Sequence, residues 1–295
     1  MRFELTTDQQ DFAASLDALL SAADPVAAAR AWAAGDHDPG LRLWERLAEQ
    51  GLTMLATEAS PVEVCVAFEA LGRHAVPGPW VESAAYLPLA LGVEVDGVAT
   101  VAMPRALDAD VADAIYTVVD GALHTATAAT AHTSVDRSRH LFDVTPGPAV
   151  EHGDLAAAYD LAVLATAAQL LGAGERVLAD AVTYVKQRRQ FGREIGSYQA
   201  IKHKLADVRI ALDFARPLVF GAALDPTPRA VSAAKVACSD AAYLASRTGL
   251  QVHGAIGYTQ EFDLSVWITK IRALVSAWGT PADHRARILA TLRSA

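Results

Sequence analysis

The stretch from Leu155 to Gln187 contains no proline, and its apolar residues recur at steps of three and four. This spacing is typical of an α-helix, and the stretch is longer than most helices of globular proteins. So long an apolar helix indicates packing in a bundle or at an interface, with neighbours on several sides. Gly172 and Gly174 lie inside it and cost about 1 kcal/mol each relative to alanine, which indicates that another helix approaches closely there.

Helices are also expected over most of the remaining chain. Hydrophobic residues make up 52% of the sequence, and alanine, the best helix former, dominates that fraction. Thr7 and Gln10 resemble the capping box that opens a helix. Further helices are predicted over residues 62–71, 198–215, 229–252 and 264–277, and from Pro281 onward.

Between Val93 and Val150 the pattern changes to short runs rich in β-formers, at 98–103, 115–119 and 140–144. Asp120-Gly121 and Pro146-Gly147-Pro148 are predicted turns between or after them. The sequence therefore predicts a mainly α fold in three parts. These are an N-terminal helical domain (1–92), a reduced β domain (93–150) and a C-terminal helical bundle (151–295).

Charge and cysteine content exclude several classes of protein. The chain has 25 Lys and Arg residues against 34 Asp and Glu residues, a net charge of −9, so a general basic surface for nucleic acid is not expected. Cys65 and Cys238 are too few and too far apart for a disulfide framework, which favours a reduced, cytoplasmic setting. The N-terminus shows no leader pattern, and no uninterrupted apolar run reaches roughly 18 residues, so neither secretion nor a membrane span is predicted.

Residues 186–204 concentrate positive charge, with six basic residues against one acidic residue in an acidic chain. The fixed fork of donors of an arginine such as Arg188 suits a phosphate group, and the cluster leads through two glycines into the start of a new helix, which also favours anions. The pattern indicates an anionic ligand. On charge alone, a solvated helix end with ordinary salt bridges is the favoured interpretation.

Residues 251–258 form a second informative motif, Gln-Val-His-Gly-Ala-Ile-Gly-Tyr. Gly254 and Gly257 permit a tight turn and a close approach of the backbone to a ligand. Gln251 and His253 add hydrogen-bonding groups beside them. Taken alone, the motif is also consistent with the end of a helix followed by a loop.

Taken together, these motifs resemble the C-terminal domain of the acyl-CoA dehydrogenases. The resemblance is strong over about 155–295, extends to the opening Phe3-Glu4-Leu5-Thr6, and is weak across 90–150. It implies an N-terminal helical domain, a middle β domain and a C-terminal four-helix bundle, and an enzyme that uses FAD to desaturate acyl-CoA thioesters. It is carried by Arg-x-x-Phe-Gly at 188–192, by 198–207, by 251–258 and by 278–287.

The resemblance also implies a role for individual residues. Arg188 is similar to the arginine that reaches the FAD pyrophosphate of the neighbouring subunit. Gln190 and Phe191 match residues that lie against the adenosine half of the cofactor. The remaining residues implied to line this cofactor site are Gln199, Gln251, His253, Gly254 and Gly257.

Two departures from the family pattern concern catalysis. One family position for the carboxylate base directly precedes the motif that matches Gly279-Thr280, and this chain has Trp278 there. The alternative position matches Ala162, with Asp160 as the nearest acid. The segment 92–150 also lacks a tryptophan and the family segment that carries a threonine or serine beside the flavin ring. The catalytic residues are therefore unknown, and an incomplete active site is expected.

A shortened chain of this kind is similar to one subunit of the actinobacterial acyl-CoA dehydrogenases of steroid catabolism that assemble as α2β2 heterotetramers. This resemblance implies a full-length partner subunit, an acyl-CoA substrate of steroid origin and an electron-transfer acceptor. Two alternatives remain open: a self-sufficient homo-oligomer using Asp160 or another acid, and a structural subunit without flavin. The histidines show no metal-ligand spacing, so no metal site is predicted.

Overall fold

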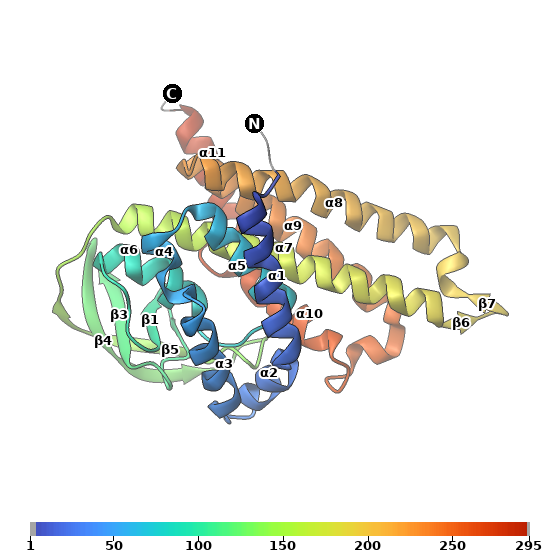
Figure 1. Cartoon of the computed structure of the whole chain (residues 1–295), viewed down its shortest axis with the longest axis horizontal. Helices are drawn as coiled ribbons and strands as arrows, with labels where there is room; N and C mark the ends of the chain where they lie inside the picture. The colour runs from blue at the N-terminus through green and yellow to red at the C-terminus, as the bar shows by residue number, and fades with distance from the viewer. Residues whose placement is uncertain (1–3, 294–295) are drawn as a thin grey trace.

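The computed structural model describes residues 4–293 and begins with a set of short helices (Figure 1). Thr6 rather than Thr7 opens the first helix, because its hydroxyl accepts from the Gln9 backbone while the Gln9 side chain accepts from the Thr6 backbone. Phe3 lies outside the described residues. The N-terminal elements are α1 (Thr7–Ala22), α2 (Pro25–Ala33), α3 (Asp38–Glu49), η1 (Leu52–Met54), α4 (Leu55–Glu58), α5 (Pro61–Arg73), η2 (Glu82–Tyr86) and α6 (Leu87–Leu91).

One small mixed sheet follows, in the strand order β1-β3-β4-β5-β2. The strands are β1 (Ala99–Ala102), β2 (Ala106–Leu107), β3 (Ala114–Val119), β4 (Ala122–His132) and β5 (Leu141–Ala149). β1 pairs with β3 in parallel and the other pairs are antiparallel. Asp120 and Gly121 both have positive φ and form the predicted tight turn between β3 and β4.

The sheet holds one strand that was not predicted, and one predicted turn was wrong. Strand β4 was not predicted, because its alternating alanines and threonines carry a weak local strand signal and its pairing with β3 and β5 keeps it extended. The predicted turn at 146–148 lies inside β5 instead. Pro146 and Pro148 are exposed, and the β4–β5 register shifts between His124 and Ala126, so this end of the ladder tolerates residues without an N–H group.

The C-terminal part is a helical bundle: α7 (Leu155–Gln187), α8 (Gln199–Leu224), α9 (Pro228–His253), α10 (Leu264–Ser276) and α11 (Pro281–Arg293). The boundaries follow the predictions closely except for α8, which continues past Ala215 through Pro217. Beyond the proline, Val219 and Phe220 are buried, and their packing against the bundle favours continuation of the helix. The mainly α fold class is confirmed.

α7 runs through the centre of the molecule, with α5 on one side and α8, α9 and α10 around it (Figure 1). A Cβ atom at Gly172 would lie 1.9 Å from the Glu69 carbonyl oxygen, and one at Gly174 would lie 2.9 Å from Leu212. The predicted close approach of helices at both glycines is therefore confirmed. By length and composition α7 could cross a membrane, but 72% of its most apolar window is buried, which is the property of a core helix.

A continuous hydrophobic core includes residues of the N-terminal helices, β1 and the bundle. Trp267 of α10 is fully buried and donates its indole N–H to the carbonyl oxygens of Gly72 and Arg73 at 3.2 and 3.1 Å. Cys65 and Cys238 are both buried and free within this core. The helical segments therefore share one core, in which the first turn of α10 contacts the C-terminal end of α5.

Candidate functional site

The basic motif forms an exposed hairpin beyond the end of α7 (Figure 1). Its strands are β6 (Arg189–Gln190) and β7 (Arg193–Glu194), and η3 (Ile195–Ser197) leads into α8. Arg188 ends α7: its N–H donates to the Tyr184 carbonyl and its own carbonyl accepts from Ile195, both at 2.8 Å. The backbone at Arg188 is thus fixed, while its side chain is exposed to solvent.

Phe191 occupies an unusual position at the tip of the hairpin. Its φ is 51°, a region that bulky residues rarely adopt, and 91% of its surface is exposed. Positive φ at Phe191 and Gly192 is the geometry of the two-residue turn that joins β6 to β7, and this turn projects the Phe191 ring into solvent. The tip therefore presents an aromatic face to a ligand or a partner.

The cations of the hairpin have no acidic partners among residues 4–293. Arg188 and Arg189 form no ion pair there, and Arg193 stacks on the Tyr198 ring at 3.9 Å. Lys186 and Lys202 are exposed as well. The segment is solvated, as the alternative interpretation expects, but the ordinary ion pairs of that interpretation are not formed among the described residues, so the positive charge is accessible to an anion.

The second motif lines a pocket of 560 Å³ where α9 ends and η4 (Gly254–Tyr258) begins. Gln251 and Gly254 contribute to its wall together with the cations Lys204 of α8 and Arg247 of α9. Gly254 has a φ of 63° and open space where a Cβ would stand, so the backbone is accessible at this point. The pocket combines positive charge with an open main chain, which suits a phosphate group.

A small hydrophobic cluster joins the two motifs. Val185 of α7 and Val252 of α9 are buried in it, and Ile195 and Ile201 pack against them. Because these residues flank the hairpin, the start of α8 and the end of α9, the cluster holds both motifs in one region. Gln199, the first residue of α8, is exposed there.

His253 and Gly257 have packing roles within this chain. The His253 ring is buried between Tyr184 and Phe262, and its Nδ1 contacts the Gly249 carbonyl at 2.8 Å. A Cβ at Gly257 would lie 3.1 Å from the Cβ of His253, so only glycine fits without displacement. These two residues shape the loop, and Gln251 and Gly254 present it to the pocket.

Trp278 occupies the position that the resemblance assigns to the base, and it is fixed in place. It is 5% exposed, has a φ of 56°, and its carbonyl oxygen accepts from Tyr159 at 3.0 Å and contacts His284 Nε2 at 2.9 Å. An indole is not a base for a carbon acid. This position therefore contributes no proton acceptor.

Asp160 does not fit the role of an alternative base. It is buried, and its carboxylate pairs with the Arg287 guanidinium. The Arg287 guanidinium occupies the carboxylate oxygen, which therefore does not point freely toward a substrate. The hypothesis that Asp160 abstracts the proton is therefore not supported by its geometry.

Glu82 is an acid that the sequence analysis missed. It is 6% exposed in η2 and lines a pocket of 500 Å³ together with Trp278, Arg139 and Arg272. Burial raises its pKa, and the Arg139 charge and the Trp278 side chain offset only part of this rise. No local signal marks it, because Glu82 and Trp278 are brought together only by folding.

Lys235 supports the backbone that leads to Trp278. It is fully buried and donates to the carbonyl oxygens of Leu274, Val275 and Gly279 at 3.0, 3.1 and 3.5 Å. Burial lowers its pKa to about 7. The amino group thus closes the end of α10 and the following turn.

This burial predicts a pH dependence of stability. Between pH 7 and the ordinary lysine pKa the unfolded chain holds a proton that the folded chain has lost, so the free energy of unfolding rises with pH by up to about 1.4 kcal/mol per unit. Below pH 7 the lysine is protonated in both states, so it no longer makes the free energy of unfolding depend on pH. Urea unfolding at about pH 7.0 and about pH 8.5, both within this window, should show a higher free energy of unfolding at the higher pH. Lys235→Met should remove this difference. Equal slopes in both proteins would contradict the assignment.

The sequence is similar to known proteins along most of its length. Residues 158–292 match the family model described as acyl-CoA dehydrogenase, C-terminal domain. The acyl-CoA dehydrogenase IpdE2 of Mycobacterium tuberculosis is 29% identical over 294 residues, which cover 89% of this chain and 90% of that protein.

Two solved structures share the fold over nearly the whole chain. One chain of the ChsE4-ChsE5 complex from Mycobacterium tuberculosis superposes with a TM-score of 0.83 at 21% identity and covers 100% of both chains. The Tcur3481-Tcur3483 steroid ACAD G363A variant has a TM-score of 0.85 at 20% identity and covers 97% of this chain and 98% of its own.

Proposed function

We propose that the chain is one of two unlike subunits of an FAD-dependent acyl-CoA dehydrogenase, because residues 158–292 match the C-terminal domain model of that family and a full-length relative is similar along most of its length. In this assembly it binds the ADP half of FAD. A fuller partner chain supports the flavin ring and supplies the base. The observation that carries the proposal is the pairing of an accessible basic site at the hairpin with a base position filled by Trp278.

FAD is the cofactor, and its charge and shape match the groups present. Its diphosphate is a dianion, and the described cations Arg188, Lys204 and Arg247 have no carboxylate partner among residues 4–293. Gly254 leaves backbone open to close approach, and Phe191 offers an exposed ring to an adenine base. When bound, FAD would supply the acceptor for a hydride from Cβ of the acyl group. The residues of this chain bind and orient the cofactor.

The acyl-CoA substrate must lose its α-proton to a base, and neither position that the resemblance assigns to this base provides a free carboxylate. Trp278 carries no base, and Asp160 is held by Arg287. In the two-subunit proposal the partner subunit supplies the carboxylate. We also propose a steroid-derived acyl group, supported by the solved structure that is named a steroid ACAD, and an electron-transfer acceptor for the reduced flavin, which follows from the resemblance to the family.

α8 offers a surface for the partner. Ile210, Phe214 and Leu218 are exposed and spaced four residues apart, which places them on one side of the helix. Their helix starts directly after the basic hairpin. An apolar stripe of this kind is typical of a protein interface, and cover by a second acyl-CoA dehydrogenase subunit in an α2β2 arrangement would bury it.

Glu82 favours a second candidate, a self-sufficient enzyme. A buried carboxyl group with a raised pKa beside Trp278 has the properties of a proton acceptor in catalysis. In that case the chain would bind the whole flavin without a partner. A purely structural subunit is the remaining alternative, and it would bind none.

One co-expression experiment separates these functions. The chain is produced alone and together with the product of its neighbouring open reading frame, and the visible absorbance of the purified proteins is recorded. Flavin bound only after co-expression supports the two-subunit proposal. Flavin bound by the chain alone supports the self-sufficient enzyme, and flavin held by the partner regardless of this chain contradicts both.

Arg188→Ala is expected to weaken FAD binding by the co-expressed complex. Loss of one charge-assisted hydrogen bond costs about 1.5–3 kcal/mol, which is roughly 10- to 150-fold in Kd. Fluorescence titration of the deflavinated complex measures the change. Arg42→Ala is the matched control, because Arg42 is an exposed arginine of α3. Equal FAD affinity in wild type and Arg188→Ala would remove Arg188 from the cofactor site.

A further inference from the structure

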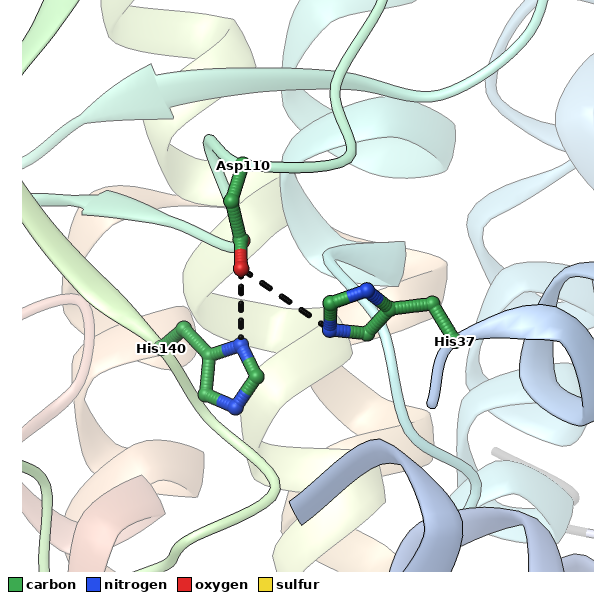
Figure 2. Close-up of side chains that lie close together, drawn as sticks. All are labelled: His37, Asp110 and His140. Atoms are coloured by element: carbon green, nitrogen blue, oxygen red, sulfur yellow. Dashed lines mark hydrogen bonds and ion pairs between the residues drawn. The ribbon is translucent and has the colours of Figure 1, made fainter. Parts of the chain in front are cut away.

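Three potential metal ligands meet where the N-terminal helices contact the sheet (Figure 2). They are His37 at the start of α3, Asp110 in the segment between β2 and β3, and His140 just before β5. Asp110 Oδ2 lies 3.1 Å from His140 Nδ1 and 3.8 Å from His37 Nε2, and all three atoms lie within 4.8 Å of one another. The cofactor site described above uses none of these residues.

The spacing suits a small divalent cation. Ligand atoms about 2.0–2.2 Å from a tetrahedral Zn²⁺ ion are roughly 3.3–3.5 Å apart, and the observed separations lie on both sides of this value. Two imidazoles and one carboxylate form a donor set that Zn²⁺ and related transition-metal ions favour. Small rotations of the side chains would therefore complete the coordination.

Of the three residues, His37 has a buried ring nitrogen that its hydrogen bonds within the chain do not account for. It stands at the N-cap of α3 but makes no capping hydrogen bond, and its buried Nε2 has no hydrogen-bond partner among residues 4–293. Trp32 holds the ring edge-on at 4.7 Å between centroids. The ring is thus positioned with a nitrogen free to bind an ion.

Asp108 positions the other side of the cluster. It is fully buried with a φ of 52°, and its Oδ1 accepts from the His140 backbone at 2.9 Å and from the Trp32 indole at 3.2 Å. Its N–H donates to the His140 carbonyl. Its Oδ2 has no partner in the described part of the chain. A supporting carboxylate that orients ligand residues is a common feature of metal sites.

We propose that His37, Asp110 and His140 bind one divalent transition-metal ion of the Zn²⁺ class, with water in the fourth position. The ion joins the start of α3 to the segment after β2, which carries Asp110, and to the residue before β5, which is His140. Its role is to fix the N-terminal helices on the sheet. Asp36 and Asp38 flank His37 and add negative charge that favours a cation.

The test uses the full-length chain without a polyhistidine tag, freed of metal with a chelator. Titration with ZnCl2, followed by elemental analysis after gel filtration, should give one bound Zn²⁺ per chain with a Kd in the micromolar range or tighter. The thermal midpoint should rise as the Zn²⁺ concentration rises, because the ion binds the folded state. Absence of saturable binding overturns the proposal.

Variants on separate elements locate the site. His37→Gln and Asp110→Asn should each weaken Zn²⁺ binding at least about tenfold, while circular dichroism in chelator confirms that each variant is folded. His132→Gln is the control, because His132 pairs with Asp143 at 2.6 Å on the same sheet but belongs to no such cluster among residues 4–293. Co²⁺ loaded into wild type should show visible bands that both ligand variants change. Equal Zn²⁺ affinity in wild type and both ligand variants would exclude this site.

Discussion

Gly172→Ala is expected to destabilise the protein by at least about 3 kcal/mol, although the same change in an open helix would stabilise it by about 1 kcal/mol. The added Cβ would lie 1.9 Å from the Glu69 carbonyl oxygen and 3.0 Å from the Arg73 nitrogen. Both are backbone atoms of α5, so they yield only if the two helices separate. Gly72 faces α7 in the same way, with its Cβ position 1.9 Å from the Gln169 carbonyl oxygen.

Gly174→Ala is the matched control, because it makes the same change two residues further along α7. The nearest atom there is a Leu212 methyl group at 2.9 Å, which can move, and Ala242 follows at 3.2 Å. We expect a cost below about 1.5 kcal/mol for this variant. Urea unfolding measures both free energies. A Gly172→Ala protein as stable as wild type would show that α5 and α7 do not cross at this distance.

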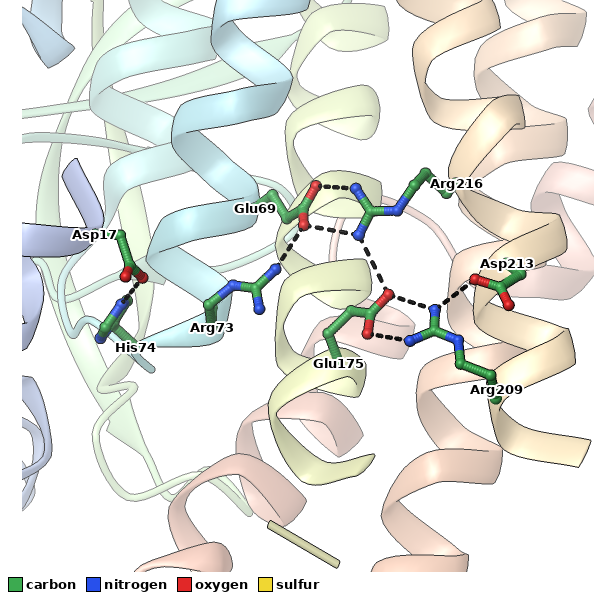
Figure 3. A network of polar contacts seen from close by, with 8 residues as sticks. All are labelled: Asp17, Glu69, Arg73, His74, Glu175, Arg209, Asp213 and Arg216. Atoms are coloured by element: carbon green, nitrogen blue, oxygen red, sulfur yellow. Dashed lines mark hydrogen bonds and ion pairs between the residues drawn. The ribbon is translucent and has the colours of Figure 1, made fainter. Parts of the chain in front are cut away.

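Arg216→Met is expected to destabilise the protein by about 2–3 kcal/mol, at the lower end of the cost of breaking a buried ion pair because the arginine is partly exposed. Arg216 donates to Glu69 at 2.8 and 2.9 Å and to Glu175 at 3.2 Å, and so connects α5, α7 and α8 (Figure 3). Both carboxylates are nearly buried. Without Arg216, Glu69 still pairs with Arg73 and Glu175 with Arg209, but each carboxylate loses part of the positive charge that offsets its burial.

The effect of Arg216→Met should depend on pH. Burial alone would raise the pKa of Glu175, but hydrogen bonds and charge from Arg209 and Arg216 lower it below its ordinary value. The stabilisation is therefore present above the unfolded pKa of about 4.3 and is lost as the pH falls below it. Arg285→Met, which removes an exposed pair with Asp240, should change stability by less than about 1 kcal/mol at any pH. Equal effects of both substitutions would contradict the network.

The helices and the motifs were predictable because their signals are local. The apolar spacing of α7 and the capping residues of the bundle depend on neighbours within a few positions, and so the predicted boundaries lie close to the observed ones. The resemblance carried by Arg188, Phe191 and Gly254 is local as well. The division into three domains stays a prediction, since a continuous core includes residues of all three segments.

Other features depend on residues that are distant in the chain. Strand β4 is extended through its two partner strands, Glu82 meets Trp278 across 196 positions of the chain, and His37 meets Asp110 and His140 at the edge of the sheet. The amino-acid order was sufficient for the helical bundle and the position of the basic segment between two helices, because periodicity and turn chemistry act over short distances. The buried residues, the ion-pair network and the cluster of His37, Asp110 and His140 were revealed only by the tertiary structure, because they arise from contacts that no local pattern encodes.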